Sequence, residues 1–138
     1  MTDNNEVIYT AKVKTTGGRQ GASRSSDGRL DINLSVPGGA GLGTNPEQLL
    51  AAGWSACFIG ALGLAARKLK VALPAETEDE VEIDLCAHEG AYFLRARHNV
   101  SLPGLEPSVA RTLVDTAHQT CPYSKATRGN VNVEINLT

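Results

Sequence analysis

Two of the three cysteines in this chain of 138 residues stand where a thiol could react. Cys57 falls in the middle of a long apolar stretch, and Cys121 comes directly before a proline. The reactive form of cysteine is the thiolate, which burial among apolar residues disfavours and a nearby cation favours. A free cysteine is also among the most buried residue types, so both residues could simply pack in a core. Composition alone favours packing, and the neighbouring residues must decide between the two interpretations.

The surroundings of Cys121 raise two further possibilities. Pro122 cannot continue a helix, so Cys121 is expected at a helix end. The run from Cys121 to Ser124 is similar to the Cys-x-x-Ser pattern of redox turns, although so short a match has low specificity. His118 could share a helix face with Cys121 as a metal ligand, but no Cys-x-x-Cys or His-x-x-x-His pair completes a zinc site. We therefore expect no metal, and we expect His118 to face solvent.

Glu47 is the acidic residue with the clearest possible link to Cys57. In one straight helix, the ten residues between them span about 15 Å and separate their directions by about 80°, so the side chains cannot touch. A guanidinium could connect them, because it binds a carboxylate through two nitrogens and neutralises a thiolate. Alternatively, Glu47 acts from a partner chain. Its simplest role is in a helix cap, because Thr44 stands three residues before it, as in a capping box.

The element that must hold Cys57 is a helix over residues 44–69. Before it, alternation predicts a half-buried strand over residues 6–15, with Val7 and Tyr9 inward, and a hairpin around Asp27-Gly28. After it, we expect a helix from Pro107 to the residue before Pro122 and a final strand over residues 131–137.

Two more strands are expected over residues 79–102, around a Glu89-Gly90 turn. Leu85 and its in-phase neighbours face inward, whereas Cys86 alternates with acidic residues on the outer face and should have no role. The order of elements predicts an α+β fold in which antiparallel sheets pack on a long buried central helix. We find no repeat and no linker, so we expect a single domain over residues 1–138.

Composition excludes several functional classes. A net charge of −2 without a cluster of Lys or Arg argues against nucleic acid as a partner. The N-terminus lacks a basic segment followed by an apolar run, so we expect no secretory signal, a cytoplasmic location and reduced cysteines. The run over residues 49–66 is about long enough to cross a bilayer, but it is rich in Ala and Gly and contains Ser55. We expect a buried helix with no membrane contact.

Two long motifs carry a family resemblance. The stretches TNPEQLLAAGWSACFIGALG and TAHQTCPYSKATRGNVNVEINL resemble the organic hydroperoxide resistance (Ohr) branch of the Ohr/OsmC family, and TTGGRQGASRSSDGRLDINLSVPGG is similar to the N-terminal hairpin of that branch. The similarity extends from about Tyr9 to the C-terminus. The chain departs from the family in a shorter loop before Thr44 and in Trp54, where a smaller aromatic residue is expected.

The resemblance implies a thiol peroxidase that protects against oxidative stress by reducing organic hydroperoxides. It assigns Cys57 as the peroxidatic thiol, Cys121 as the resolving thiol, and Arg19 with Glu47 as the charged pair that activates Cys57. It also implies an intertwined homodimer with a site at each subunit interface. It further implies that no cofactor is bound and that a lipoyl-type dithiol, carried by a lipoylated protein, recycles the enzyme.

The residues around Cys57 lead us to expect a particular substrate class. An apolar pocket lined by Leu50, Phe58 and Ile59 would favour alkyl or fatty-acid hydroperoxides over hydrogen peroxide, which gains nothing from apolar burial. The alternatives are an OsmC-type peroxidase with broader substrates, a disulfide reductase built around Cys121, and a non-catalytic dimer that binds apolar ligands.

Overall fold

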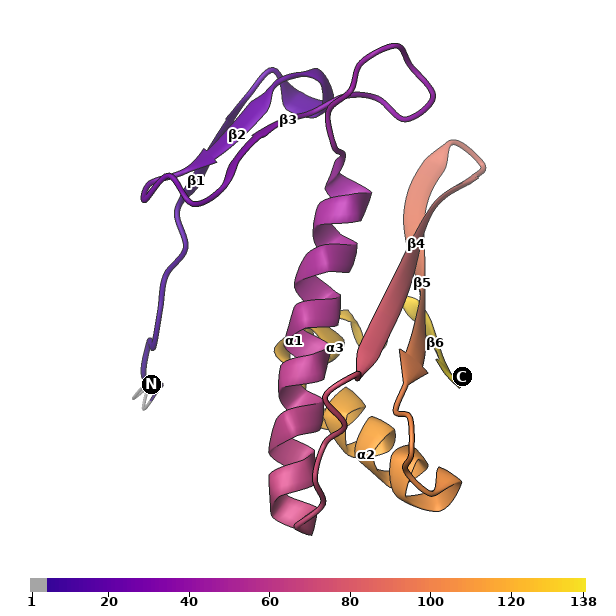
Figure 1. Cartoon of the computed structure of the whole chain (residues 1–138). Helices are drawn as coiled ribbons and strands as arrows, with labels where there is room; N and C mark the ends of the chain where they lie inside the picture. The colour runs from indigo at the N-terminus through magenta and orange to yellow at the C-terminus, as the bar shows by residue number, and fades with distance from the viewer. Residues whose placement is uncertain (1–4) are drawn as a thin grey trace. The chain divides into compact units, whose positions relative to one another are not determined.

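The computed structural model describes residues 5–138 and contains two compact units, Met1–Pro46 and Glu47–Thr138. Each unit has its own three-stranded sheet (Figure 1). The fold is α+β, with two small sheets and one long helix, as the sequence predicts.

The first unit is an antiparallel sheet in the order β1-β2-β3. Its strands are β1 (Val13–Thr16), β2 (Ala22–Ser25) and β3 (Asp31–Asn33), with a short helical turn η1 (Gly18–Gln20) between the first two. Asp27 shapes the turn between β2 and β3, because its Oδ1 accepts hydrogen bonds from Ser25 Oγ at 2.6 Å and from the Arg29 backbone N–H at 3.0 Å. The hairpin expected around Asp27-Gly28 is confirmed.

The predicted first strand is wrong over residues 6–12. Strand β1 begins only at Val13, and the side chains of Val7 and Tyr9 are exposed rather than half-buried. The reason is the length of the neighbouring strand: β2 ends at Ser25, which pairs with Val13. The alternating apolar residues before Val13 therefore extend beyond the ladder that would have buried them.

Helix α1 (Pro46–Leu69) lies in the second unit from Glu47 onward, and it confirms the helix predicted over residues 44–69 to within two residues. Pro46 is its first residue, a position that proline favours, and Thr44 lies two residues before it. Glu47 lies in the first turn, and Arg67 and Lys68 lie in the last, each at the end of the helix dipole that its charge favours.

Burial of α1, which the sequence predicts to be a buried helix, is one-sided in the single chain. The buried face consists of Trp54, Phe58, Ala61, Leu62, Ala65 and Ala66. Four exposed residues recur every fourth position and form what we call the exposed stripe: Ala52, Ala56, Gly60 and Leu64. The helix is long and apolar enough to cross a membrane, but a core helix of a soluble protein meets the same criterion.

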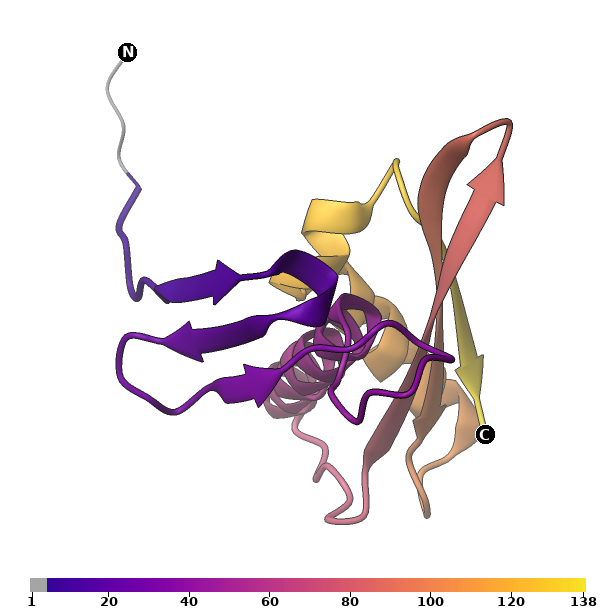
Figure 2. The same ribbon diagram turned by 90° about the horizontal axis from the view of Figure 1, so that it is seen from above.

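The remaining elements of the second unit form a hairpin, a helical connection and a last strand. They are β4 (Glu78–His88), β5 (Ala91–Ser101), α2 (Pro107–Thr120), α3 (Pro122–Thr127) and β6 (Asn132–Leu137). Both turn residues between β4 and β5 have positive φ, 49° for Glu89 and 80° for Gly90, as in the tight hairpin turn expected there. Helices α1 and α2 lie on one face of the β4-β5-β6 sheet (Figure 2).

Two details of this sheet differ from expectation. Strand β6 runs parallel to β5, with His98 opposite Ile135, because α2 and α3 carry the chain back to the starting edge before β6 begins. Leu85, expected inward, is 48% exposed close to the hairpin turn, whereas Ala96, His98 and Val100 are buried.

Candidate active site

The two cysteines singled out in the sequence lie side by side. Cys57 is in the middle of α1, Cys121 is the residue between α2 and α3, and their sulfurs are 3.1 Å apart as free thiols. Cys121 has no exposed surface, whereas Cys57 is partly buried. The fold thus brings together two thiols that are 64 residues apart in the sequence.

Cys121 owes its position to a break between two helices. Its backbone is extended (φ −60°, ψ 123°), ending α2 and starting α3 at a single residue. Pro122 disfavours the helical conformation in the residue before it and is a favourable first residue for the next helix. The sequence prediction placed the end of α2 correctly but missed α3. Pro122 at the first helical position is the feature that could have indicated it.

Helix α3 contacts α1 closely next to the sulfur pair, about one helical turn before Cys57. The indole Nε1–H of Trp54 donates to Ser124 Oγ at 3.2 Å, with both side chains fully buried. The Tyr123 ring lies against Gly53, where an added Cβ would be 2.9 Å from the phenol oxygen. Glycine therefore permits the close approach of the two helices at this point. We call these contacts, together with the Cys57–Cys121 pair, the helix junction.

The electrostatics of the helix junction oppose ionisation of Cys57. Burial raises the pKa of the Cys57 thiol, and the adjacent Cys121 thiol raises it further, while the backbone N–H of Tyr123 acts in the opposite direction. Burial is the largest of these effects, as the sequence led us to expect. A nucleophilic Cys57 therefore needs a cation to stabilise its thiolate.

Arg19 and Glu47 are the residues predicted to supply that electrostatic support. Arg19 lies in η1 of the first unit, and Glu47 is a partly buried residue in the first turn of α1. Because α1 is continuous from Glu47 to Cys57, the calculated separation of about 15 Å along its axis applies. Their roles in activating Cys57 stay predictions.

Two expectations about neighbouring residues are wrong. His118 is partly buried rather than facing solvent, and burial together with the Arg128 charge lowers its pKa. Phe58 has no exposed surface and packs on the ring of His98, so it is a core residue rather than part of an open pocket. Within residues 5–138, no group of three or more His, Cys, Asp and Glu side chains is arranged to hold a metal ion.

A buried Asp79–His98 pair behind the helix junction was missed from the sequence. Asp79 Oδ2 lies 2.7 Å from His98 Nδ1, and neither side chain has exposed surface. The ring of His98 packs edge-on against Trp54, with 4.7 Å between centroids. His98 alternates in phase with buried Ala96 and Val100, which is the sequence feature that could have indicated its burial.

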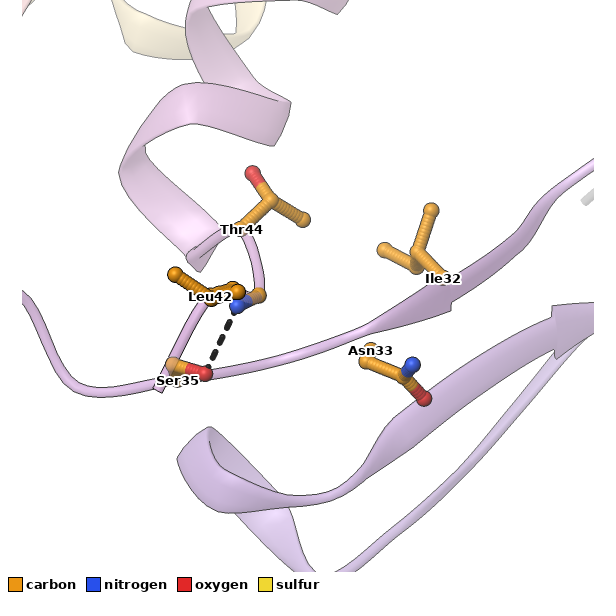
Figure 3. A pocket seen from close by; sticks show the side chains of 6 residues that line it. Ile32, Asn33, Ser35, Leu42 and Thr44 are labelled. Atoms are coloured by element: carbon orange, nitrogen blue, oxygen red, sulfur yellow. Dashed lines mark hydrogen bonds between the residues drawn. The ribbon is translucent and has the colours of Figure 1, made fainter. Parts of the chain in front are cut away.

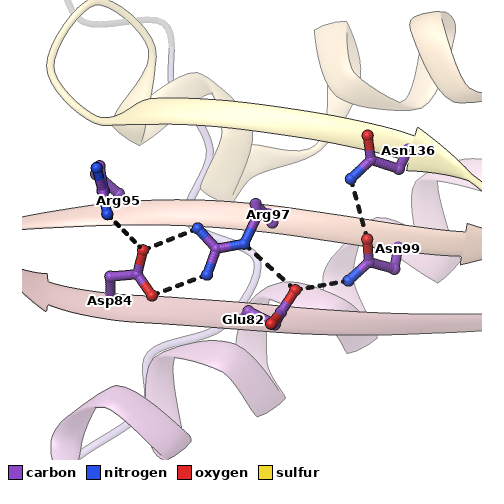
Figure 4. A network of polar contacts seen from close by, with 6 residues as sticks. All are labelled: Glu82, Asp84, Arg95, Arg97, Asn99 and Asn136. Atoms are coloured by element: carbon purple, nitrogen blue, oxygen red, sulfur yellow. Dashed lines mark hydrogen bonds and ion pairs between the residues drawn. The ribbon is translucent and has the colours of Figure 1, made fainter.

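Two other regions, a pocket and a surface network, carry no comparable chemistry. A pocket of about 380 Å³ in the first unit is lined by Ile32, Asn33, Ser35, Leu42, Gly43 and Thr44, none of them titratable (Figure 3). On the outer sheet face, Arg97 donates two hydrogen bonds of 2.8 Å to Asp84, and these lower the pKa of Asp84 to about 2 (Figure 4). This second arrangement is a paired surface network without a nucleophile.

Comparison with known proteins places these features in context. The family described as OsmC-like protein matches residues 38–136. The chain is 44% identical over 141 residues to an organic hydroperoxide resistance protein of Xanthomonas axonopodis pv. citri, covering 99% of each chain. It is 41% identical over 134 residues to the organic hydroperoxide resistance protein OhrB of Bacillus subtilis, covering 95% of this chain and 98% of that protein.

Solved structures agree with these relatives. A crystal structure of an organic hydroperoxide resistance protein from Legionella pneumophila superposes with a TM-score of 0.90 at 38% identity, covering 96% of this chain and 99% of that one. The crystal structure of Bacillus subtilis OhrB gives a TM-score of 0.87 at 41% identity, covering 96% and 100%.

Proposed function

This chain belongs to the OsmC-like protein family, in its organic hydroperoxide resistance branch, and from this premise we propose that it is a thiol peroxidase. It reduces organic hydroperoxides to alcohols, using Cys57 as the nucleophile and Cys121 as the resolving thiol. The observation that carries the proposal is the 3.1 Å distance between the two free sulfurs, one of them fully buried.

The reaction has three steps. The Cys57 thiolate attacks an oxygen of the hydroperoxide, the O–O bond breaks, and the alkoxide leaves as the alcohol after protonation, so Cys57 becomes a sulfenic acid. The Cys121 thiol then displaces the hydroxyl of the sulfenic acid, which leaves as water, and a disulfide forms. An external dithiol reduces the disulfide by two thiol–disulfide exchanges.

Activation of the nucleophile requires the charged pair. Since burial raises the pKa of Cys57, Arg19 stabilises the thiolate and Glu47 holds the guanidinium in place. The external dithiol is of the lipoyl type, supplied by a lipoylated protein, and the enzyme works in the cytoplasm without a bound cofactor.

The exposed stripe of α1 supports the homodimer that the family resemblance implies. Its four residues are apolar, and three of them are small enough to let another helix approach closely. A helix face of this kind is usually covered by a partner. The proposed partner is a second copy of this chain.

Disulfide mapping tests the proposed function. We expect one equivalent of cumene hydroperoxide to produce a Cys57–Cys121 disulfide in reduced protein, detected by mass spectrometry of peptides. Cys57→Ser should abolish peroxide consumption, and Cys121→Ser should stop at the sulfenic acid or its over-oxidised products. The matched control is Cys86→Ser, which removes the third thiol and should leave turnover unchanged. Peroxide consumption by Cys57→Ser at the rate of the unmodified protein would exclude this mechanism.

A further inference from the structure

The helix junction contains two pairs of contacts with the same spacing. Trp54 and Cys57 are three residues apart on α1, and Ser124 of α3 is three residues after Cys121, which caps that helix. The sulfurs meet at one end of this repeat, and the Trp54–Ser124 hydrogen bond lies at the other. The hydrogen bond therefore fixes α3 against α1 about one helical turn from the reacting sulfurs.

Helix α3 needs such an anchor because it has only six residues. A helix of that length is not stable by itself in water, so its position depends on tertiary contacts. The Trp54–Ser124 bond is suited to this role because both side chains are fully buried. If the bond breaks, no solvent is at hand to satisfy the indole N–H, which makes the alternative positions of α3 unfavourable.

Residues of the sheet also hold the Trp54 indole in place. The ring of His98 packs edge-on against Trp54 at 4.7 Å, and the imidazole is fixed by Asp79 at 2.7 Å from its Nδ1. Both members of this pair come from the sheet, Asp79 from β4 and His98 from β5. A buried chain of contacts thus links the sheet to the turn that carries Cys121.

We propose that Trp54 and Ser124 are positioning residues for disulfide formation, because their hydrogen bond keeps the Cys121 sulfur beside the Cys57 sulfur after the peroxide step. The inference rests on the proposed peroxidase function and assigns these residues to its second step alone. In that step the S–S bond forms while the S–O bond of Cys57 and the S–H bond of Cys121 break. The hydroxyl and the proton leave as water, the sulfenic sulfur is reduced and the thiol sulfur is oxidised.

The physical consequence is a competition for the sulfenic acid. When the Cys121 sulfur lies beside Cys57, it reacts with the sulfenic acid before a second hydroperoxide molecule arrives. When α3 is free to shift, the sulfenic acid persists and further hydroperoxide oxidises it to the sulfinic acid, which a dithiol cannot reduce.

The experiment compares Ser124→Ala, Trp54→Phe and the double variant with unmodified protein. Each single variant removes one side of the bond, and Ser55→Ala is the matched control, since its hydroxyl lies on the same helix and bonds the Ala52 carbonyl oxygen. Reduced proteins are mixed with cumene hydroperoxide and quenched over time. Mass spectrometry then quantifies sulfenic acid (trapped with a dione reagent), disulfide and sulfinic acid.

We expect sulfenic acid to form at the unmodified rate in both single variants, and disulfide formation to slow by about tenfold, as the loss of one buried hydrogen bond would produce. Sulfinic acid should accumulate in proportion. The double variant should be no slower than the single ones, because all three lack the same bond. The control should behave as the unmodified protein.

Three outcomes would overturn the inference while leaving the peroxidase function intact. These are an unchanged partition between disulfide and sulfinic acid, equal loss of both chemical steps, and additive effects in the double variant. Failure of the unmodified protein to form the disulfide would instead refute the proposed function.

Discussion

Burial of the Cys57 sulfur has opposite effects on the proposed reaction. The same apolar surroundings that would accept an alkyl hydroperoxide raise the pKa of the thiol and so reduce the fraction that is ionised at neutral pH. The backbone N–H of Tyr123 offsets this effect only in part, because burial is the larger influence. A full positive charge is therefore needed to stabilise the Cys57 thiolate, and this is the role assigned to Arg19.

Replacing Arg19 with Ala should raise the pKa of Cys57 and slow peroxide consumption at neutral pH, by about tenfold for each unit of the rise. The pH dependence of Cys57 alkylation, followed in a background that lacks Cys86 and Cys121, measures the pKa. Arg29→Ala is the control, because Arg29 lies in the same unit with a side chain that is 91% exposed. Coincident titration curves for Arg19→Ala and the unmodified protein would rule out the assigned role.

The candidate site could be predicted from the sequence only where its residues belong to long motifs. Cys57 and Cys121 follow from motif position, and the structure places their sulfurs together. The Trp54–Ser124 and Asp79–His98 contacts could not be predicted, because they join residues 70 and 19 positions apart and depend on how the elements pack. The type and position of each of these residues in the sequence do not indicate which distant residue it will contact.

At the scale of elements, periodicity was a good guide wherever an element buries its apolar face within its own unit. Helix α1 lies where its continuous apolar run predicted it, without help from a helical period. Periodicity placed helix α2 and the β4–β5 hairpin correctly. It failed for residues 6–12, whose alternation has no adjoining strand of the first sheet to bury it, and for α3, which is too short to show a helical period. The parallel direction of β6 depends on the path of the connection, which alternation does not encode.

The packing of α1 leads to a prediction about stability. Leu62 has no exposed surface, so Leu62→Ala should lower the free energy of unfolding by about 2–5 kcal/mol through lost burial and a residual cavity. Urea unfolding at a fixed protein concentration measures the change. Leu69→Ala makes the same replacement on the same helix where the side chain is 46% exposed, and should cost about 1 kcal/mol or less. Equal losses for the two variants would contradict the one-sided burial of α1.

At the scale of the whole molecule, the exposed stripe is the main apolar surface that α1 leaves uncovered. A twofold interface is self-complementary, so one stripe of small residues can pack against its own copy. Leu64, the largest member and 57% exposed, would be buried in such an interface.

Leu64→Glu should therefore dissociate the proposed homodimer, because a carboxylate would be buried there without a partner charge. Sedimentation velocity gives the mass of the particle in solution. Ser108→Glu, which adds the same charge at an exposed position in the first turn of α2, should leave the dimer intact. A dimer that survives Leu64→Glu would place the interface elsewhere.

The sulfur pair joins points 64 residues apart, one in the first helix of the second unit and the other close to its last strand. Oxidation would close most of that unit into a covalent loop. For a loop of this size, the entropy that the unfolded chain loses corresponds to about 4 kcal/mol of stabilisation. The oxidised protein should then withstand more urea than the reduced one. The free energy of unfolding would therefore rise when peroxide oxidises the two thiols and fall when the external dithiol reduces the disulfide. The protein would be hardest to unfold in the disulfide form, while peroxide is present and reductant is scarce.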